Sequence, residues 1–181
     1  MTRMSPAQTN APIRDMQKLP GRYLTFRNSN ESYGIRVLAV REIIRQAPIT
    51  VVPQMPPYIR GVLNLRGRII PVIDLKHRFG MGVAEVGNRT CIVVVQIDTT
   101  ARGPIQMGLM VDIVEEVVQI AAADISPTPD FGVSIDTSFL LGMAKVKGEV
   151  KILLNLDHVL TGEQVDHLSS VTNPVAPCPT V

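Results

Sequence analysis

The sequence predicts an all-β fold of two similar small barrels, and three features of its 181 residues support this prediction. Segments rich in Val, Ile, Leu and Thr alternate with turns that contain Gly or Pro, which is typical of short strands. Helical periodicity is confined to a few short pieces. A repeat then relates the two halves of the chain. Many short strands fit small barrels or a sandwich, and the repeat favours two barrels.

Eight segments have the composition of strands, and the turns between them include Gly67, Gly103-Pro104 and Gly148. The expected strands are residues 22–26, 33–40, 62–65, 68–75, 90–97, 105–118, 141–146 and 150–156. Three short helices are expected at residues 57–60, 75–79 and 156–160. Gly80 follows the second of them and predicts its end.

Two alignments within the chain carry the repeat. Residues 61–78 align without a gap with 142–159, and residues 33–44 align with 107–118. The identical pairs are Gly61/Gly142, Gly67/Gly148, Leu75/Leu156, His77/His158, Gly34/Gly108, Val37/Val111, Val40/Val114 and Glu42/Glu116. Unrelated stretches would match at about one position in 15–18. Any two amphipathic hairpins with a central Gly align to some extent, but matches in the same order in both halves favour duplication.

The duplication predicts a domain organisation. A first barrel lobe is expected at residues 21–80 and a second at 81–162, between flexible tails at 1–20 and 163–181. We expect four glycines to serve as structural turns, because tight hairpins require positive φ angles that disfavour residues with a Cβ atom. They are Gly61, Gly67, Gly142 and Gly148.

The net charge of +2 hides an uneven distribution. Residues 21–80 carry ten Arg and Lys against three acidic residues, whereas residues 81–181 carry five against twelve. This pattern fits a nucleic-acid ligand, a complementary protein or a solvated surface. The sequence shows neither an export signal nor a long apolar run, and its two cysteines do not suggest disulfides. The expected location is therefore the cytoplasm.

The known catalytic and metal-binding patterns are missing from the sequence. It has no phosphate-binding loop, no nucleophile elbow and no cluster of metal ligands, so we expect neither a cofactor nor a metal. Cys91 lies in an apolar run, where burial would blunt its reactivity. Glu115 and Glu116 are adjacent, and a regular strand would point them to opposite faces. The pattern argues against an enzyme.

Two kinds of binding module then remain. A nucleic-acid-binding barrel needs exposed rings for stacking, and this chain has only four Phe, three Tyr and no Trp. A protein-binding module needs apolar contacts beside charges that fix the register. Arg66 at a hairpin turn, with Val40 and Glu42 on one face of a strand, would meet that need. Solvated surface charge is the alternative for Glu42 and Arg66.

Residues 56–80 read PPYIRGVLNLRGRIIPVIDLKHRFG and strongly resemble the signature of the CheW family. The resemblance continues through YGIRVLAVREI, GLMVDIVEEV, ISPTPDFG and KVKGEVKILLNLDHVL, and covers about residues 21–162. It implies a fold of two SH3-like five-stranded β-barrels and a scaffold without a catalytic step. Proteins of this family couple the cytoplasmic tip of a chemoreceptor to the histidine kinase CheA in bacterial chemosensory arrays, where they also form rings with other copies.

The resemblance also assigns roles to individual residues. The receptor-binding positions of the family fall on Val40, Glu42 and Arg66, and a groove between the barrels takes the receptor helix. The contact with the regulatory domain of the kinase falls on Asp130 and Phe131. Ser126 stands where some members of the family have Arg, which removes one charged contact. Recruitment from the cytoplasm to membrane-associated receptor arrays is implied, whereas the chemosensory pathway is left open.

Overall fold

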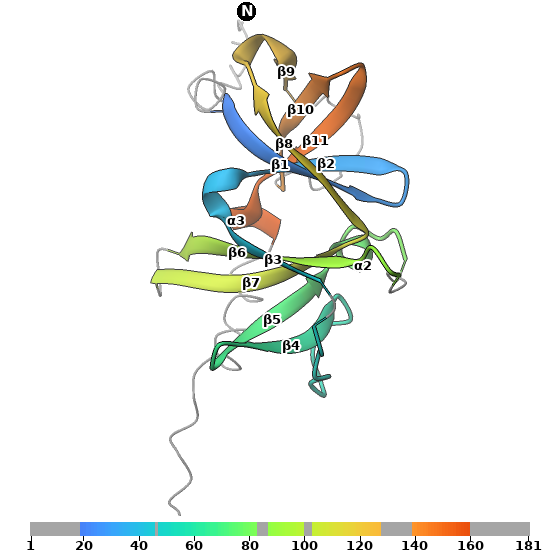
Figure 1. Cartoon of the computed structure of the whole chain (residues 1–181), viewed down its shortest axis with the longest axis vertical. Coiled ribbons are helices and arrows are strands. Elements are labelled where there is room, and N and C mark those ends of the chain that lie inside the picture. The colour runs from blue at the N-terminus through green and yellow to red at the C-terminus, as the bar shows by residue number, and fades with distance from the viewer. Residues whose placement is uncertain (1–18, 46, 83–86, 100–102, 128–138, 160–181) are drawn as a thin grey trace, which may run out of the picture.

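The computed structural model of the protein describes residues 19–45, 47–82, 87–99, 103–127 and 139–159, and consists of two curved β-sheets (Figure 1). Sheet A has six strands in the order β8-β1-β2-β11-β10-β9 and forms the upper part of the view in Figure 1. Its strands are β1 (Gly21–Asn28), β2 (Glu31–Arg36), β8 (Ile113–Ile120), β9 (Ile125–Ser126), β10 (Leu140–Val146) and β11 (Glu149–Leu154).

Sheet B has five strands in the order β3-β6-β7-β5-β4. Its strands are β3 (Val40–Arg45), β4 (Ile59–Leu65), β5 (Arg68–Asp74), β6 (Cys91–Thr99) and β7 (Gly103–Val111). The short helices are η1 (Val37–Ala39), α2 (Leu75–Arg78), η2 (Ala122–Asp124) and α3 (Leu156–Val159). None of the helices in the described residues is long and apolar enough to cross a membrane.

The two sheets have the same strand order, which confirms the predicted all-β fold and its internal duplication. The strands correspond one by one: β8, β1, β2, β11 and β10 of sheet A take the places of β3, β6, β7, β5 and β4 in sheet B. The registers agree as well, because Gly34 pairs with Leu153 in sheet A and the equivalent Gly108 pairs with Val72 in sheet B. The two-residue strand β9 is the one addition to the five strands of sheet A.

Each sheet combines two strands from one half of the repeat with three from the other: β1 and β2 join β8, β10 and β11, whereas β6 and β7 join β3, β4 and β5. The chain leaves sheet A after β2 and enters sheet B as β3, and it returns from β7 in sheet B to β8 in sheet A. Figure 1 shows both connections between the two sheets. The predicted division at residues 21–80 and 81–162 therefore does not describe the sheets, since β1 and β2 pair with β8 and β11. The basic and acidic halves of the sequence are mixed in each sheet for the same reason.

Three further predictions need correction. The segment expected as a helix at residues 57–60 is a turn followed by the first residues of β4. The long strands expected at 33–40 and 105–118 are each interrupted, at η1 and at Asp112, where the chain changes sheet. Gly61 and Gly142 lie inside β4 and β10, at register shifts, and not at turns. A Cβ atom on Gly61 would collide with the carbonyl oxygen of Thr50, which explains why glycine is needed there.

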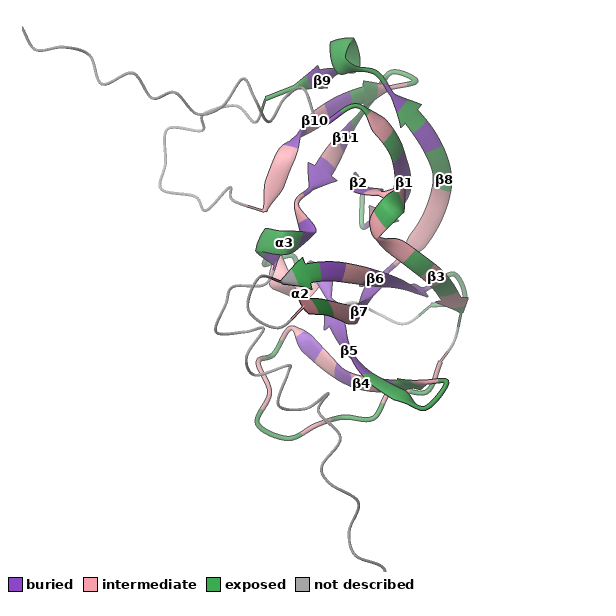
Figure 2. Cartoon of the chain, turned by 90° about the vertical axis from the view of Figure 1, so that its left-hand side faces the viewer, coloured by how far each residue is buried: buried purple, intermediate pink, exposed green. Residues whose placement is uncertain are grey.

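Three apolar clusters hold the sheets together. One lies in the curve of sheet A and includes Tyr23, Ile120 and Leu153. Another lies in the curve of sheet B, and the largest lies between the sheets, with Phe26 and Leu109 among its members. Along β8, buried and exposed residues alternate toward its end, as the coloured bands in Figure 2 show. One face of this end of β8 is thereby left for the surface.

Candidate functional site

Glu42 and Arg66 meet between the two edges of sheet B. Arg66 Nη2 lies 3.1 Å from Glu42 Oε2, which joins β3 to the hairpin between β4 and β5. Val40 begins β3 two residues earlier and is half-buried. A bulge between Val40 and Glu42 pairs them with the adjacent residues Val95 and Val94, so the expectation that both lie on one face of a regular strand is wrong, and Val40 packs against the core between the sheets. We call Val40, Glu42 and Arg66 the Glu42 cluster. Most of the Arg66 side chain, 82%, is exposed and available to a partner.

The turn that carries Arg66 has a defined shape. Arg66 and Gly67 have φ angles of 52° and 83°, and Leu65 pairs with Arg68 across them. Two residues with positive φ between paired strands form the tight hairpin whose twist matches that of the sheet. The Gly67 N–H donates to Asn64 Oδ1 at 3.0 Å, which holds the loop closed. The guanidinium group thus projects from a rigid support.

A second cluster of the same kind lies on sheet A. Lys147 and Gly148 have φ angles of 51° and 80° in the hairpin between β10 and β11. Lys147 Nζ lies 2.8 Å from Oε1 of Glu116 on β8, the strand equivalent to β3. Val114, the counterpart of Val40, is half-buried. We call these three residues the Glu116 cluster. The repeat could have identified this cluster from the sequence, because it matches Glu116 with Glu42 and Lys147 with the similar Arg66.

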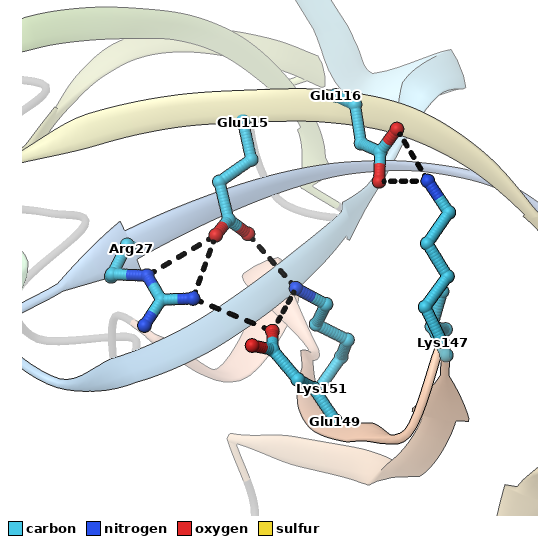
Figure 3. A pocket seen from close by; sticks show the side chains of 7 residues that line it. Arg27, Glu115, Glu116, Lys147, Glu149 and Lys151 are labelled. Atoms are coloured by element: carbon cyan, nitrogen blue, oxygen red, sulfur yellow. Dashed lines mark hydrogen bonds and ion pairs between the residues drawn. The ribbon is translucent and has the colours of Figure 1, made fainter.

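Beside the Glu116 cluster lies an ionic network that has no counterpart in sheet B. Lys151, whose side chain is 6% exposed, donates to Ser32 Oγ at 2.8 Å and lies 3.0 Å from Glu115 and 3.2 Å from Glu149. Arg27 Nη2 lies 3.0 Å from Glu115 Oε1. Figure 3 shows Arg27 on β1, Glu115 on β8, and Glu149 and Lys151 on β11 pointing toward one another. These four side chains line a cavity of about 380 Å³.

The electrostatics of the network favour ionised carboxylates. Burial by itself would raise the pKa of Glu115, but hydrogen bonds from Ser32, Lys151 and Arg27 outweigh it and lower the pKa to about 2. The hydrogen bond of Arg27 to Glu115, and the opposite charge of that carboxylate, raise the pKa of Arg27. Each charge in this network faces an opposite charge, so the arrangement holds strands together and offers no poised acid or base for catalysis.

Glu115 and Glu116 do not point to opposite faces as a regular strand predicted. Both line the cavity, and both extend from β8 toward the hairpin between β10 and β11 (Figure 3). The cause is a bulge, because the register of β8 against β1 shifts between Phe26 and Leu24. Thr25 Oγ1 accepts the Glu116 N–H at 3.3 Å and donates to the Glu116 carbonyl at 2.9 Å, which satisfies the bulged backbone.

Some predicted residues are not part of this picture. Asp130, Phe131 and residues 1–18 and 163–181 of the predicted tails lie outside the described residues, whereas Ser126 lies in β9 and pairs with Met143. Leu19, which was expected in the flexible N-terminal tail, is buried in the apolar cluster of sheet A. Cys91 is buried with a free thiol in β6. Within the described ranges, no group of three or more His, Cys, Asp or Glu is placed to hold a metal ion.

Comparisons with known proteins identify the family. The model of the CheW-like domain matches residues 22–164. The chain belongs to the CheW-like family. Chemotaxis protein CheW of Rhizobium meliloti (strain 1021) is 35% identical over 78% of this chain and 88% of its own length. Chemotaxis protein CheW of Klebsiella aerogenes is 32% identical over 82% and 87%, respectively.

A solved structure agrees with the CheW-like fold. The scaffolding protein TtCheW from Thermoanaerobacter tengcongensis superposes with a TM-score of 0.70 at 36% sequence identity, over 81% of this chain and 96% of that one. CheW-like proteins are adaptors of chemotaxis and not enzymes, so this chain is a non-enzymatic adaptor. The alternative of a nucleic-acid-binding module is not supported.

Proposed function

We propose that this CheW-like chain couples the cytoplasmic tip of a chemoreceptor to the regulatory domain of the histidine kinase CheA. The receptor contact is the Glu42 cluster, and its support is the ion pair of Glu42 with Arg66 between the two edges of sheet B, with Val40 two residues before Glu42. The kinase contact is the segment with Asp130 and Phe131, as the resemblance implies. The protein works in the cytoplasm, is recruited to membrane-associated arrays and joins rings with other copies.

The geometry of the Glu42 cluster explains how such an adaptor controls a kinase without chemistry. Arg66 stands on a two-residue turn and is tied to Glu42 on a strand that packs against β6. A partner helix bound there is held at a fixed position relative to both sheets. A change in the receptor then shifts the kinase equilibrium through differential contacts, because a rigid adaptor passes on changes in position.

The decisive experiment reverses the charge of Arg66. We expect Arg66→Glu to abolish the pull-down of a receptor signalling fragment, because the variant faces Glu42 and the partner with the wrong charge. Lys147→Glu is the matched control, since Lys147 occupies the equivalent turn of sheet A, and it should retain receptor binding. Both variants should keep the circular dichroism spectrum and the binding of the kinase regulatory domain. Loss of receptor binding in both variants, or in neither, would contradict the assignment.

A further inference from the structure

The repeat gives the chain two similar charged clusters, and the structure shows where they differ. The Glu42 and Glu116 clusters share the hairpin, the acidic residue and the half-buried valine. A partner helix that recognised these features alone would bind both surfaces equally. Specificity for one surface needs additional differences, either attractive on one side or repulsive on the other. Two positions beside the clusters provide such differences.

The first difference lies at the crossings between the sheets. The crossing from β7 to β8 is fixed by Asp112, which lies 2.6 Å from Lys76 Nζ and accepts the Ser29 N–H at 2.9 Å. Its own N–H donates to Asn28 Oδ1 at 3.0 Å. The equivalent residue in the crossing from β2 to β3 is Leu38, on η1.

Leu38 is 84% exposed, the highest value among the large apolar side chains of the described residues. Its neighbours Val37 and Ala39 pack against the core between the sheets, so the turn is anchored while Leu38 points away from that core. Two peptide units separate Leu38 from Val40, which limits their Cα atoms to about 7 Å. Leu38 therefore presents an apolar side chain directly beside the Glu42 cluster.

The second difference is a reversal of charge. Arg41 is exposed and donates to Gln96 Oε1 at 3.1 Å, and no carboxylate of the described residues pairs with it. The equivalent residue on sheet A is Glu115, which is held in the ionic network with Arg27 and Lys151. Like Arg41, Arg68 is an exposed residue of sheet B, and its counterpart Glu149 is acidic.

The charges around the two clusters therefore differ in sum. Arg41, Arg66 and Arg68 against Glu42 leave two positive charges on β3 and the hairpin between β4 and β5, and Leu38 directly precedes β3 in the chain. On sheet A, the lining of the cavity has equal numbers of cationic and carboxylate side chains and is neutral overall. An apolar residue in a positively charged surrounding fits an amphipathic helix that carries an apolar residue between acidic ones. The neutral surface of sheet A, with Asp112 in place of Leu38, offers such a helix no comparable contact.

We propose that Leu38 and Arg41 are the residues that make the Glu42 cluster, and not the Glu116 cluster, the docking surface for an acidic amphipathic helix. This proposal rests on the proposed function, in which that helix belongs to the receptor tip. Leu38 enters the apolar stripe of the helix, and Arg41 extends the positive field that attracts its acidic flank. The chain accordingly binds one such helix and not two, although its fold is duplicated.

The test introduces two residue types of the sheet A surface, one at a time, at the equivalent positions on sheet B. In Leu38→Asp and Arg41→Glu the full chain receives the residue types of Asp112 and Glu115, and binding to a receptor signalling fragment is measured by calorimetry at low and high salt. We expect Leu38→Asp to weaken binding at least about tenfold, since the variant loses the apolar side chain that the bound helix buries. Arg41→Glu should also weaken binding and reduce its salt dependence.

Matched controls carry the same changes elsewhere. Val150→Asp places an acid at an exposed apolar site of β11, and Arg22→Glu reverses an exposed charge of β1. Both should bind within about twofold of the wild type, and Leu38→Met should do the same because it keeps an apolar side chain. Should Leu38→Asp alter the circular dichroism spectrum, Leu38→Ser is measured in its place with the same expected loss.

The outcomes separate this proposal from the proposed function. Unchanged binding of Leu38→Asp and Arg41→Glu, together with loss of binding in Arg66→Glu, overturns the specificity roles and leaves the receptor contact standing. A stoichiometry of two helices per chain also overturns the proposal. Failure of the wild type to bind any receptor fragment overturns the proposed function itself.

Discussion

Next to their equivalent hairpins, between β10 and β11 in sheet A and between β4 and β5 in sheet B, the two sheets share a backbone but differ in their buried side chains. In sheet A the buried Lys151 is surrounded by Glu115, Glu149 and Ser32, whereas the equivalent position in sheet B is Ile70, a member of an apolar cluster. The comparison shows that one backbone accepts either an ionic or an apolar solution at the same point. The ionic solution joins more strands, whereas the apolar one gives Arg41 no carboxylate partner among the described residues.

The largest difference between the sheets should appear at a pair of equivalent glycines. Gly61 has a φ of 146°, and an added Cβ would collide with the Thr50 carbonyl oxygen, whereas at Gly142 the nearest atom, Ser126 O, would lie 2.8 Å away. We expect Gly61→Ala to lower the free energy of unfolding by about 3 kcal/mol and Gly142→Ala by about half of that. Urea denaturation measures both. Equal losses would contradict this ranking, because they would show that the backbone at Thr50 and the backbone of β9 resist an added Cβ atom to the same extent.

The next effect concerns the buried cation. Glu115→Gln removes the charge that faces Lys151 and Arg27, so we expect it to lower the free energy of unfolding by about 2 kcal/mol. Lys151→Ile, which introduces the residue type of the other sheet, should cost less than Glu115→Gln, because apolar residues replace buried ions at little loss. The same denaturation series ranks the two variants. A larger loss of stability for Lys151→Ile than for Glu115→Gln would contradict this prediction, because it would show that an apolar residue cannot replace the buried ammonium group at this site.

The smallest effect is a dependence on pH. The pKa of Glu115 is about 2 in the folded chain and has an ordinary value of 4.5, so the unfolded chain takes up the proton first as the pH falls. The contribution of Glu115 to stability is therefore complete above about pH 5 and is lost progressively toward pH 2. We expect the stability difference between the wild type and Glu115→Gln to shrink over this interval. A difference independent of pH would contradict the ionic network.

Much of the fold could be predicted from the sequence because the repeat kept its structural positions. Gly67 and Gly148 marked two hairpins, and the match of Glu42 with Glu116 reflected two equivalent strands. The exchange of the β1-β2 and β6-β7 hairpins between the halves could not be predicted, since periodicity identifies a strand and not the sheet that receives it. An unbroken run such as residues 33–40 conceals the point where the chain crosses.

The site was harder to predict than the fold. Alternation along a strand assigned Glu115 and Glu116 to opposite faces, and the bulge that brings them together depends on Thr25 from a distant part of the chain. Lys151 in an apolar strand gave no sign of its partners, because Ser32 and Glu115 come from two distant segments of the chain. Leu38 lies inside the strand predicted at residues 33–40, whereas the structure exposes it on η1 between two residues that pack against the core.

The crossing of β3 and β8 between the sheets has a consequence for how the chain assembles. A polypeptide that ended at residue 80 would hold β1 and β2 without β8 or β11, and β3 to β5 without β6 or β7. Both partial sheets would present open edges, which attract other chains. During synthesis, sheet B can close once β7 has emerged from the ribosome, whereas sheet A waits for the last strand. Sheet B can therefore form before sheet A, but the fold is complete only when the last strand of sheet A has paired.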